Sequence, residues 1–464
     1  MKHAVVILAA GKGTRMKSHL PKVLHPLLGR PMLAYVVEAA AKSGAERVVV
    51  VVGYGAEMVK TALADTPVTF VEQKEQLGTA HALLAAKEGL SDFSGAVLVT
   101  SGDTPLLSAE TLKRLAGALE AQGGGMALLA LKLEDPFGYG RVVRDAQGQV
   151  ARIVEEKDAS PEERQIQEVN SGVYAFDPEV WTFLPRVKND NRAGEYYLPD
   201  LVALYREAQK PVGMLVAEDK SELLGVNTRA QLAEVEGVLL ARLRRQWMEA
   251  GVRMHLPETI YLEPTVELAP DVVLEPGVIL TGQTRVGEGA RIGAYSVIRD
   301  SELAPGAEVR PHSVLEGARL AEGAVAGPFA RLRPGAELAK GAFVGNFVEV
   351  KKSRLGPGVK AGHLTYLGDA EVGTGTNVGA GVITANYDGE NKHPTYIGKG
   401  AFIGSNSVLI APVRIGDGAF VAGGSAINQD VPEGALAIAR GRQRNIEGWA
   451  KRKKRYAKEQ EVEE

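Results

Sequence analysis

Positive side chains gather around a glycine-rich turn near the beginning of the sequence. Residues 9–16 read Ala-Ala-Gly-Lys-Gly-Thr-Arg-Met and follow the apolar run 5–8. Small residues in such a turn let backbone N–H groups approach a phosphate closely. Lys12, Arg15 and Lys22 add three positive charges, and a triphosphate needs such charge while its α-phosphorus is attacked. The turn lacks the third glycine of the dinucleotide fingerprint and the spacing of a Walker loop, so it predicts a nucleotide-phosphate site of neither type.

An aspartate follows the next strongly apolar run. Asp103 stands in Ser-Gly-Asp-Thr-Pro at 101–105, directly after the run 96–100. An acid just past the carboxyl end of a parallel strand is well placed to hold Mg²⁺ in the crevice where such sheets bind ligands. A helix cap or a turn acid is the alternative interpretation of an aspartate in this position.

Polar residues in the second half suggest a different reaction. His363 stands in Lys-Ala-Gly-His-Leu-Thr-Tyr at 360–366. A single histidine is more often a surface or core residue, but a neutral imidazole can also take the proton of an attacking amine, and Glu349 could orient it. Asn386 and Tyr387 offer hydrogen-bond donors for the oxyanion of a tetrahedral intermediate. Each of these residues alone is weak evidence for a particular reaction.

Two cations accompany this second group. Arg333 and Lys351 could clamp the phosphate of a phosphorylated acceptor, with the arginine favouring bidentate contact.

The segments that must position the first group alternate between strand-like and helix-like sequence. Up to about residue 227, β-branched runs such as 5–8 and 96–100 alternate with Ala/Leu/Glu-rich segments such as 31–43 and 110–122. This alternation predicts βαβ units and a mostly parallel sheet covered by helices.

The second group lies in a repeat with a period of six. Its clearest run of aliphatic residues is Ile397, Ile403, Leu409, Ile415, Val421 and Ile427. One inward aliphatic side chain per hexad predicts a parallel β-helix, in which each hexad forms one flat face of a triangular coil. The register slips by one residue between Val378 and Ile397, so we expect a protruding loop at 385–394.

Composition sets the class of protein. With 464 residues, 45% hydrophobic and 24% charged, the chain is expected to be a soluble protein with two large domains or a domain and a repeat array. Its formal net charge of -3 gives no global attraction to nucleic acid or membrane, so we expect small-molecule partners. The absence of cysteine excludes disulfides and thiolate metal sites. The first apolar run is too short for a signal peptide or a membrane span, so a cytoplasmic location is expected.

Motifs along the first half resemble those of sugar-nucleotide pyrophosphorylases. The motifs are 8–16 with Pro21-Lys22, Gln73 with 76–80, Gly102-Asp103, 138–141, Glu155, Asn170 and 225–227. More narrowly, they resemble the uridylyltransferase half of the bacterial bifunctional N-acetylglucosamine-1-phosphate uridylyltransferase and glucosamine-1-phosphate acetyltransferase family. The resemblance implies a Rossmann-like nucleotidyltransferase domain.

The same resemblance implies roles for individual residues. The implied nucleotide-binding residues are Leu8, Ala9, Ala10, Gly11, Lys22, Gln73, Gly78, Thr79, Ser101, Gly102 and Asp103. The implied sugar-phosphate residues are Gly140, Glu155, Asn170 and Asn227, and the implied Mg²⁺ ligands are Asp103 and Asn227. We expect an oxygen of N-acetylglucosamine 1-phosphate to attack the α-phosphorus of UTP in line, with Arg15 and Lys22 stabilising the developing charge.

Motifs in the repeat resemble the acetyltransferase half of the same family. They are 331–335, 345–349, 362–369, Asn377 and 385–389. The resemblance implies that His363 is the general base. The implied glucosamine 1-phosphate residues are Arg333, Lys351, Tyr366 and Asn377, and the implied acetyl-CoA residues are Ala380, Asn386, Tyr387, Ser405, Gly423 and Arg440. Gly423 stands where the family has alanine, which leaves the side-chain packing at that position open.

These observations predict an α/β domain followed by an all-β domain. We expect a uridylyltransferase domain at 1–227, a linker helix at 228–251, and a left-handed parallel β-helix of hexapeptide repeats with a C-terminal tail at 252–464. The left hand, which departs from the usual crossover rule, and a homotrimer with acetyltransferase sites at subunit boundaries are implied by the resemblance alone.

Two alternatives remain open on the sequence. A related class of enzyme joins a nucleotidyltransferase to a β-helix that serves only regulation or assembly, and His363 and Arg333 argue against it. A scaffold without chemistry would not need Lys22 and Asp103. The basic run 451–455 is typical of a solvated tail, and its contact with CoA phosphates stays an open possibility.

Overall fold

The computed structural model describes residues 1–450, and the chain forms two compact units. The first unit is Met1–Leu243, and the second begins at Arg244. This division falls inside the helix α7 (Arg229–Glu249), where the sequence predicts a connecting helix. The basic run 451–455 lies outside the described residues. Among residues 1–450, none of the helices combines the length and the apolar character that crossing a membrane requires.

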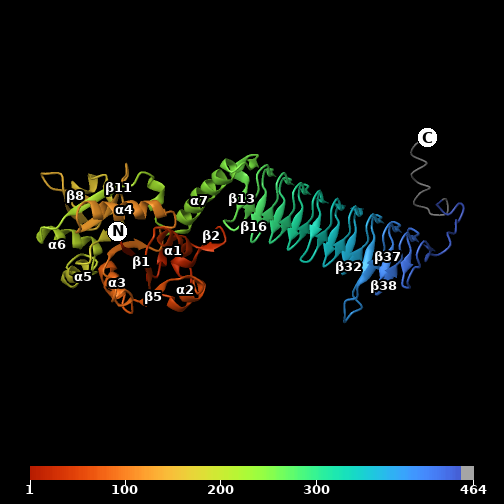
Figure 1. Ribbon diagram of the computed structural model, residues 1–464, viewed down its shortest axis with the longest axis horizontal. Helices are drawn as coiled ribbons and strands as arrows, with labels where there is room; N and C mark the ends of the chain where they lie inside the picture. The colour runs from red at the N-terminus through yellow and green to blue at the C-terminus, as the bar shows by residue number, and fades with distance from the viewer. Residues whose placement is uncertain (451–464) are drawn as a thin grey trace. The chain divides into compact units, whose positions relative to one another are not determined.

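A twisted sheet forms the centre of the first unit (Figure 1). In order across the sheet, its strands are β11 (Val212–Val216), β7 (Met126–Lys132), β10 (Glu168–Phe176), β6 (Ala96–Ser101), β1 (His3–Ala9), β4 (Arg47–Val52) and β5 (Thr69–Glu72). Strand β10 runs antiparallel to both of its neighbours, while the other pairs are parallel. The predicted mostly parallel sheet is confirmed.

Helices bury both faces of this sheet. Side chains alternate along a strand, so Val5 and Ile7 of β1 point to one face and Ala4 and Val6 to the other. The first face packs against α1 (Met32–Lys42), α2 (Ala56–Ala62) and α4 (Ala109–Ala121). The second packs against α3 (Thr79–Ala86), α5 (Val180–Phe183) and α6 (Leu201–Glu207). Buried layers on both faces leave the strand ends as the place for a site.

A hairpin extends the sheet beside β10. Strands β8 (Arg141–Arg144) and β9 (Val150–Val154) pair with each other, and β8 pairs with β10 through Arg141 and Val169. The segment after β9 therefore lies close to the start of β8.

The second unit is a parallel β-helix built of three long sheets, which we call faces A, B and C (Figure 1). Face A runs from β12 (Arg253–Met254) to β41 (Leu436–Ala437), face B from β13 (Tyr261–Leu262) to β40 (Ala426–Ile427), and face C from β14 (Glu267–Leu268) to β38 (Val413–Ile415). From β12 to β38 each coil contributes one strand to each face, and the inward aliphatic residues of the hexads are buried. The predicted hexapeptide β-helix is confirmed.

One segment leaves the stack of coils. Strand β34 (Ile383–Ala385) is followed by residues 386–394 before β35 (Thr395–Ile397) resumes face C (Figure 1). A bridge between Tyr387 and Lys392 closes this inserted loop on itself. Asp388 accepts backbone hydrogen bonds from Glu390 and Asn391, so the loop has its own fixed shape.

Candidate active sites

A cleft of about 310 Å³ lies where β1, β5 and β6 of the first unit end. Ten predicted nucleotide residues line it, namely Leu8, Ala9, Ala10, Gly11, Lys22, Gln73, Gly78, Thr79, Ser101 and Asp103. Gly102 does not line the cleft but lies behind it, where its backbone N–H donates to Leu8 O at 2.9 Å. Segments that are far apart in the sequence thus meet at one edge of the sheet, as the strand order requires.

Four polar side chains form a cluster at this cleft. Lys22 Nζ donates to Asp103 Oδ2 and, at 3.1 Å, to Asn227 Oδ1. Arg15 Nη2 donates to the same Asn227 oxygen at 2.9 Å. The side chains of Lys22 and Asp103 are 16% and 12% exposed, so this ion pair is largely shielded from water. A cation therefore already lies between the two predicted metal ligands.

The donor set suits Mg²⁺ bound together with substrate phosphates. Mg²⁺ is typically held by one or two protein oxygens, with phosphate oxygens and waters completing an octahedron. Asp103 and Asn227 offer two oxygens close enough to share one ammonium. Within residues 1–450 there is no group of three or more His, Cys, Asp or Glu side chains that would hold a metal without substrate.

The loop before α3 shapes one wall of the cleft. Gly78 has φ +122°, and a Cβ added there would lie 2.5 Å from Tyr196 O, so only glycine fits. Gln73, which is buried, donates from Nε2 to Gly78 O at 3.1 Å, and Gln76 Nε2 donates to Ala10 O at 2.9 Å. These bonds hold the two nucleotide loops against each other.

The predicted sugar-phosphate residues meet around the hairpin β8–β9. Asn170 on β10 donates its backbone N–H to Gly140 O at 2.8 Å and its side-chain amide to Tyr174 OH at 2.7 Å. A Cβ added to Gly140 would lie 2.9 Å from Glu155 Oε1, so this backbone passes directly beside the carboxylate. Gly140, Glu155 and Asn170 thus form one group, and Asn227 lies in the cleft cluster instead.

Negative charge surrounds this second group. Burial, followed by the charges of Asp200 and Asp158, raises the pKa of Glu155 above its ordinary value, and Arg141 opposes that rise. Burial, with Asp190 and Asp158 adding to it, raises the pKa of Asp200 to about 6. The carboxyl groups here therefore hold protons more tightly than exposed ones.

In the β-helix, predicted acetyltransferase residues lie along the corner between faces A and B. Backbone hydrogen bonds at this corner run from Gly381 N to His363 O, from Asn406 N to Ala380 O, and from Gly424 N to Ser405 O. Successive coils therefore place His363, Ala380, Ser405 and Gly423 one above another, and Arg440 Nη1 donates to Gly423 O at 2.7 Å. The side chain of His363 is exposed at this corner.

A second group gathers on face B and at its far corner. Strand β28 (Glu349–Lys351) lies beside β31 (Tyr366–Gly368) in register. Arg333 Nη1 donates to Glu349 Oε1 at 2.9 Å. A Cβ added to Gly368 would lie 2.3 Å from the hydroxyl of Tyr366 and 2.8 Å from Asn386 Nδ2, so these two side chains converge. The structure brings Arg333, Lys351, Tyr366 and Asn386 together.

Some expected contacts are not found. Glu349 accepts from Arg333 and, among the described residues, makes no hydrogen bond to His363, so its expected orienting role is not supported. Asn377 lies on face A in β33 (Asn377–Val378), away from the other three predicted sugar-phosphate residues. Tyr387 is exposed, and its hydroxyl donates to Gly389 O inside the inserted loop rather than projecting a free donor.

Sequence reasoning missed three residues at these sites. Glu195 lines the nucleotide cleft, but it lies in a loop that carries no recognisable motif. Gln76 belongs to the motif 76–80, but the sequence predicts no binding role for its side chain. Lys392 of the inserted loop lies against Lys351 and, with lesser contributions from burial and Arg333, lowers the pKa of Lys351. The signal that the sequence offers for Lys392 is a lysine inside the insertion that the slip in the hexad register marks.

Comparison with known proteins agrees with this architecture. Residues 5–167 match the MobA-like NTP transferase domain, and residues 394–429 match the bacterial transferase hexapeptide model with its six repeats. A nucleotidyltransferase unit joined to a hexapeptide β-helix defines a two-domain transferase.

Full-length relatives narrow this class. A Thermus thermophilus protein called bifunctional protein GlmU is 64% identical over 97% of this chain and 99% of its own length. Proteins of the same name from Anaeromyxobacter dehalogenans and Syntrophotalea carbinolica are 52% and 49% identical, covering 96% and 97% of this chain and 92% and 97% of their own. The chain belongs to the bifunctional GlmU family. It is a bifunctional transferase that makes UDP-N-acetylglucosamine by acetyl transfer and uridylyl transfer, as the sequence predicted.

Proposed function

We propose that the cleft of the first unit binds UTP and N-acetylglucosamine 1-phosphate for in-line attack on the α-phosphorus of UTP. The observation that carries this proposal is the shielded cluster in which Lys22 Nζ contacts both Asp103 and Asn227. When bound between these two oxygens, Mg²⁺ would supply charge neutralisation for the phosphates. Lys22 would then turn to the phosphates, where Arg15 also lies within reach.

The remaining residues form two groups, one for the nucleotide and one for the sugar. The glycine-rich turn and the loop of Gly78 and Thr79 surround the nucleotide, while Gly140, Glu155 and Asn170 hold the sugar. Phosphoryl transfer of this type needs positioning and electrostatic stabilisation rather than a protein nucleophile. Uridylyl transfer releases pyrophosphate as the leaving group.

We propose that the β-helix transfers the acetyl group of acetyl-CoA to the amine of glucosamine 1-phosphate. His363 takes a proton from the attacking amine, and Arg333, Lys351 and Lys392 receive the phosphate. Lys392 and Arg333 lower the pKa of Lys351 although Asp369 opposes them, and this local excess of positive charge supports an anion site. The ladder from Ala380 through Ser405, Gly423 and Arg440, joined by Asn386 and Tyr387, would hold acetyl-CoA.

We also propose a homotrimer in the cytoplasm. Within one chain, His363 and Asn377 belong to face A and its corner, whereas Arg333, Lys351 and Tyr366 belong to face B. A neighbouring copy that brings its face B to this corner would complete the site. Sedimentation or light scattering tests the assembly.

The test of both activities is a coupled assay with glucosamine 1-phosphate, acetyl-CoA, UTP and Mg²⁺ that follows free CoA and pyrophosphate separately. We expect His363→Ala to stop CoA release while pyrophosphate release from supplied N-acetylglucosamine 1-phosphate continues. We expect Asp103→Ala to do the reverse. Loss of both products in either variant would contradict the assignment of one site to each unit.

A further inference from the structure

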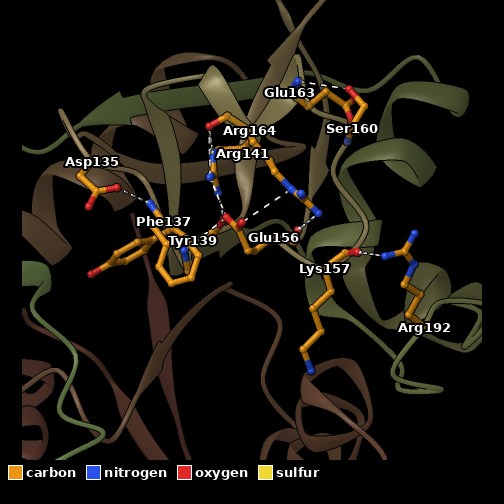
Figure 2. A network of polar contacts seen from close by, with 11 residues as sticks. Asp135, Phe137, Tyr139, Arg141, Glu156, Lys157, Ser160, Glu163, Arg164 and Arg192 are labelled. Carbon is orange, nitrogen blue, oxygen red and sulfur yellow. Dashed lines mark hydrogen bonds and ion pairs between the residues drawn. The ribbon is translucent and has the colours of Figure 1, made fainter.

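The guanidinium of Arg141 contacts three segments of the chain beside the predicted sugar-phosphate residues (Figure 2). Arg141 is 1% exposed. Its Nη2 pairs with Glu156 Oε2 at 2.7 Å, and its guanidinium also donates to the carbonyl oxygens of Tyr139 and Arg164. A buried ion pair is weak evidence for stability, because the cost of removing both charges from water offsets their attraction. Its position next to a binding group calls for another explanation.

The Glu156 carboxylate holds both ends of one short turn, residues 138–141. Its Oε2 accepts from the Arg141 guanidinium (Figure 2). The same oxygen accepts the Gly138 N–H at 3.3 Å. Gly140 lies between these two anchor points and passes so close to Glu155 that a Cβ would come within 2.9 Å of its Oε1. Because Glu155 and Glu156 are adjacent in the chain, the ion pair fixes where the turn lies relative to the Glu155 carboxylate.

Arg141 also acts on Glu155 electrostatically. The charged groups that act on Glu155 are Asp200, Asp158 and Arg141, and the arginine alone favours the ionised form. The turn and its anchor therefore influence both the position and the charge of the carboxylate that is expected to face the sugar.

We propose that the Arg141–Glu156 pair positions the sugar-phosphate site. The pair holds the turn 138–141 beside Glu155, so that Gly140 and the Glu155 carboxylate bind the sugar together. This inference rests on the proposed roles of Gly140 and Glu155. Neither Arg141 nor Glu156 touches the substrate in this scheme. Loss of the pair should therefore weaken binding of the sugar phosphate and leave nucleotide binding unchanged.

Glu163 provides a matched control in the neighbouring segment (Figure 2). Its side chain is 17% exposed, compared with 22% for Glu156, and it also pairs with an arginine, Arg152. Glu163 additionally accepts the Ser160 N–H at 2.9 Å, and its carboxylate makes no hydrogen bond or ion pair with the turn 138–141. Removing Glu163 therefore removes a carboxylate of similar burial without releasing the turn.

The experiment compares Glu156→Ala, Glu156→Gln and Glu163→Ala in the full chain. We expect Glu156→Ala to raise the KM for N-acetylglucosamine 1-phosphate about tenfold, with the KM for UTP and the rate of acetyl transfer unchanged. Glu156→Gln keeps an acceptor for Gly138 and Arg141, so most of the sugar-phosphate affinity should return. Glu163→Ala should leave both KM values as in the wild type.

A pH profile tests the electrostatic link between Arg141 and Glu155, while the separate KM values and the Glu163→Ala control separate positioning from simple support of the fold. In Glu156→Gln the charge of Arg141 loses its counter-ion, so the pKa of Glu155 should fall. The acid limb of kcat/KM for the sugar phosphate should then move to lower pH, and an unmoved limb would show that Arg141 does not act on the charge of Glu155. If Glu156→Ala does not fold, the Gln variant and its pH profile still decide the question.

Two outcomes would overturn the inference. Equal rises in both KM values, or the same effect in Glu163→Ala as in Glu156→Ala, would assign Glu156 to the general stability of the unit. A Glu155→Gln variant distinguishes this failure from failure of the proposed function. If Glu155→Gln raises the KM for sugar phosphate but Glu156→Ala does not, only the positioning role is wrong; if Glu155→Gln has no effect, the sugar site itself is wrong.

Discussion

Asp200 carries an energetic penalty that a single substitution should remove. Burial, with Asp190 and Asp158 adding to it, raises the pKa of Asp200 from an ordinary 3.8 to about 6. Within residues 1–450 its side chain makes no hydrogen bond or ion pair, although it precedes the helix α6. Asp200→Asn should therefore remove the charge without breaking a contact.

The sign and size of the effect follow from linkage between protonation and folding. A carboxyl group with a raised pKa contributes stability below its unfolded pKa, and that stability is lost as pH rises through the folded pKa. A rise to about 6 corresponds to a penalty of about 3 kcal/mol at pH 8, at 1.36 kcal/mol per unit. Partial exposure reduces this figure, and an ionised group before α6 gains up to about 1 kcal/mol from the helix dipole. We expect Asp200→Asn to stabilise the first unit by about 1 to 2 kcal/mol at pH 8 and by almost nothing at pH 4.

The assay must report the first unit alone, because two units need not unfold together. Trp181 packs against the same core as α6, so a background with Trp247 and Trp449 replaced by Phe makes it the sole tryptophan reporter. Urea unfolding of this background at pH 4 and pH 8 gives the free energy of unfolding with and without Asp200→Asn. Asp65→Asn, at an exposed position, is the control. A gain of the same size at both pH values, or a loss at pH 8, would refute the reasoning.

Three further predictions concern other parts of the chain. Gly78→Ala should cost at least about 2 kcal/mol of stability and raise the KM for UTP, because the new Cβ would meet Tyr196 at a φ that disfavours side chains; urea unfolding and initial rates measure both. Lys392→Met should raise the pKa of Lys351. It should also reduce the rise in melting temperature that inorganic phosphate gives the β-helix, and an unchanged rise would show that Lys392 is not part of the proposed anion site. Arg319→Gln should change the stability of the β-helix by less than about 1 kcal/mol, and less again in high salt, because its two glutamate partners on the adjacent coils lie 3.8 and 3.9 Å away and are exposed.

The fold could be predicted from the sequence because its signals are local and periodic. Runs such as 96–100 have a strand's composition whatever surrounds them, and they form strands here. The hexad register is enforced by burial of one aliphatic side chain per face, so the slip before Ile397 marks an insertion, which the structure has at 386–394. Handedness leaves no such local signal, because either hand would bury the same side chains.

The candidate sites were predictable only where a motif concentrates the residues. The cleft gathers Gly11, Gln73 and Asp103 because each follows the carboxyl end of a strand in one sheet. Glu195 comes from an irregular loop whose path depends on tertiary contacts, which no spacing rule describes. Arg141 stood in a recognised motif, but its burial and its pairing with Glu156 follow from how two segments pack.

The two sites balance charge in opposite ways before substrate arrives. In the first, Lys22 is paired with Asp103 and shares Asn227, so the phosphate and the divalent cation of the proposed mechanism would have to exchange partners with an existing ion pair. In the second, Lys392 and Arg333 act on Lys351 with like charge and Asp369 only opposes them, so the proposed phosphate would relieve a repulsion among the cations. Under the proposed mechanism, the first arrangement should make metal and nucleotide binding depend on each other, because either alone would leave one charge without a partner. Because Lys392 is exposed, the affinity of the proposed second site for anions should weaken with salt.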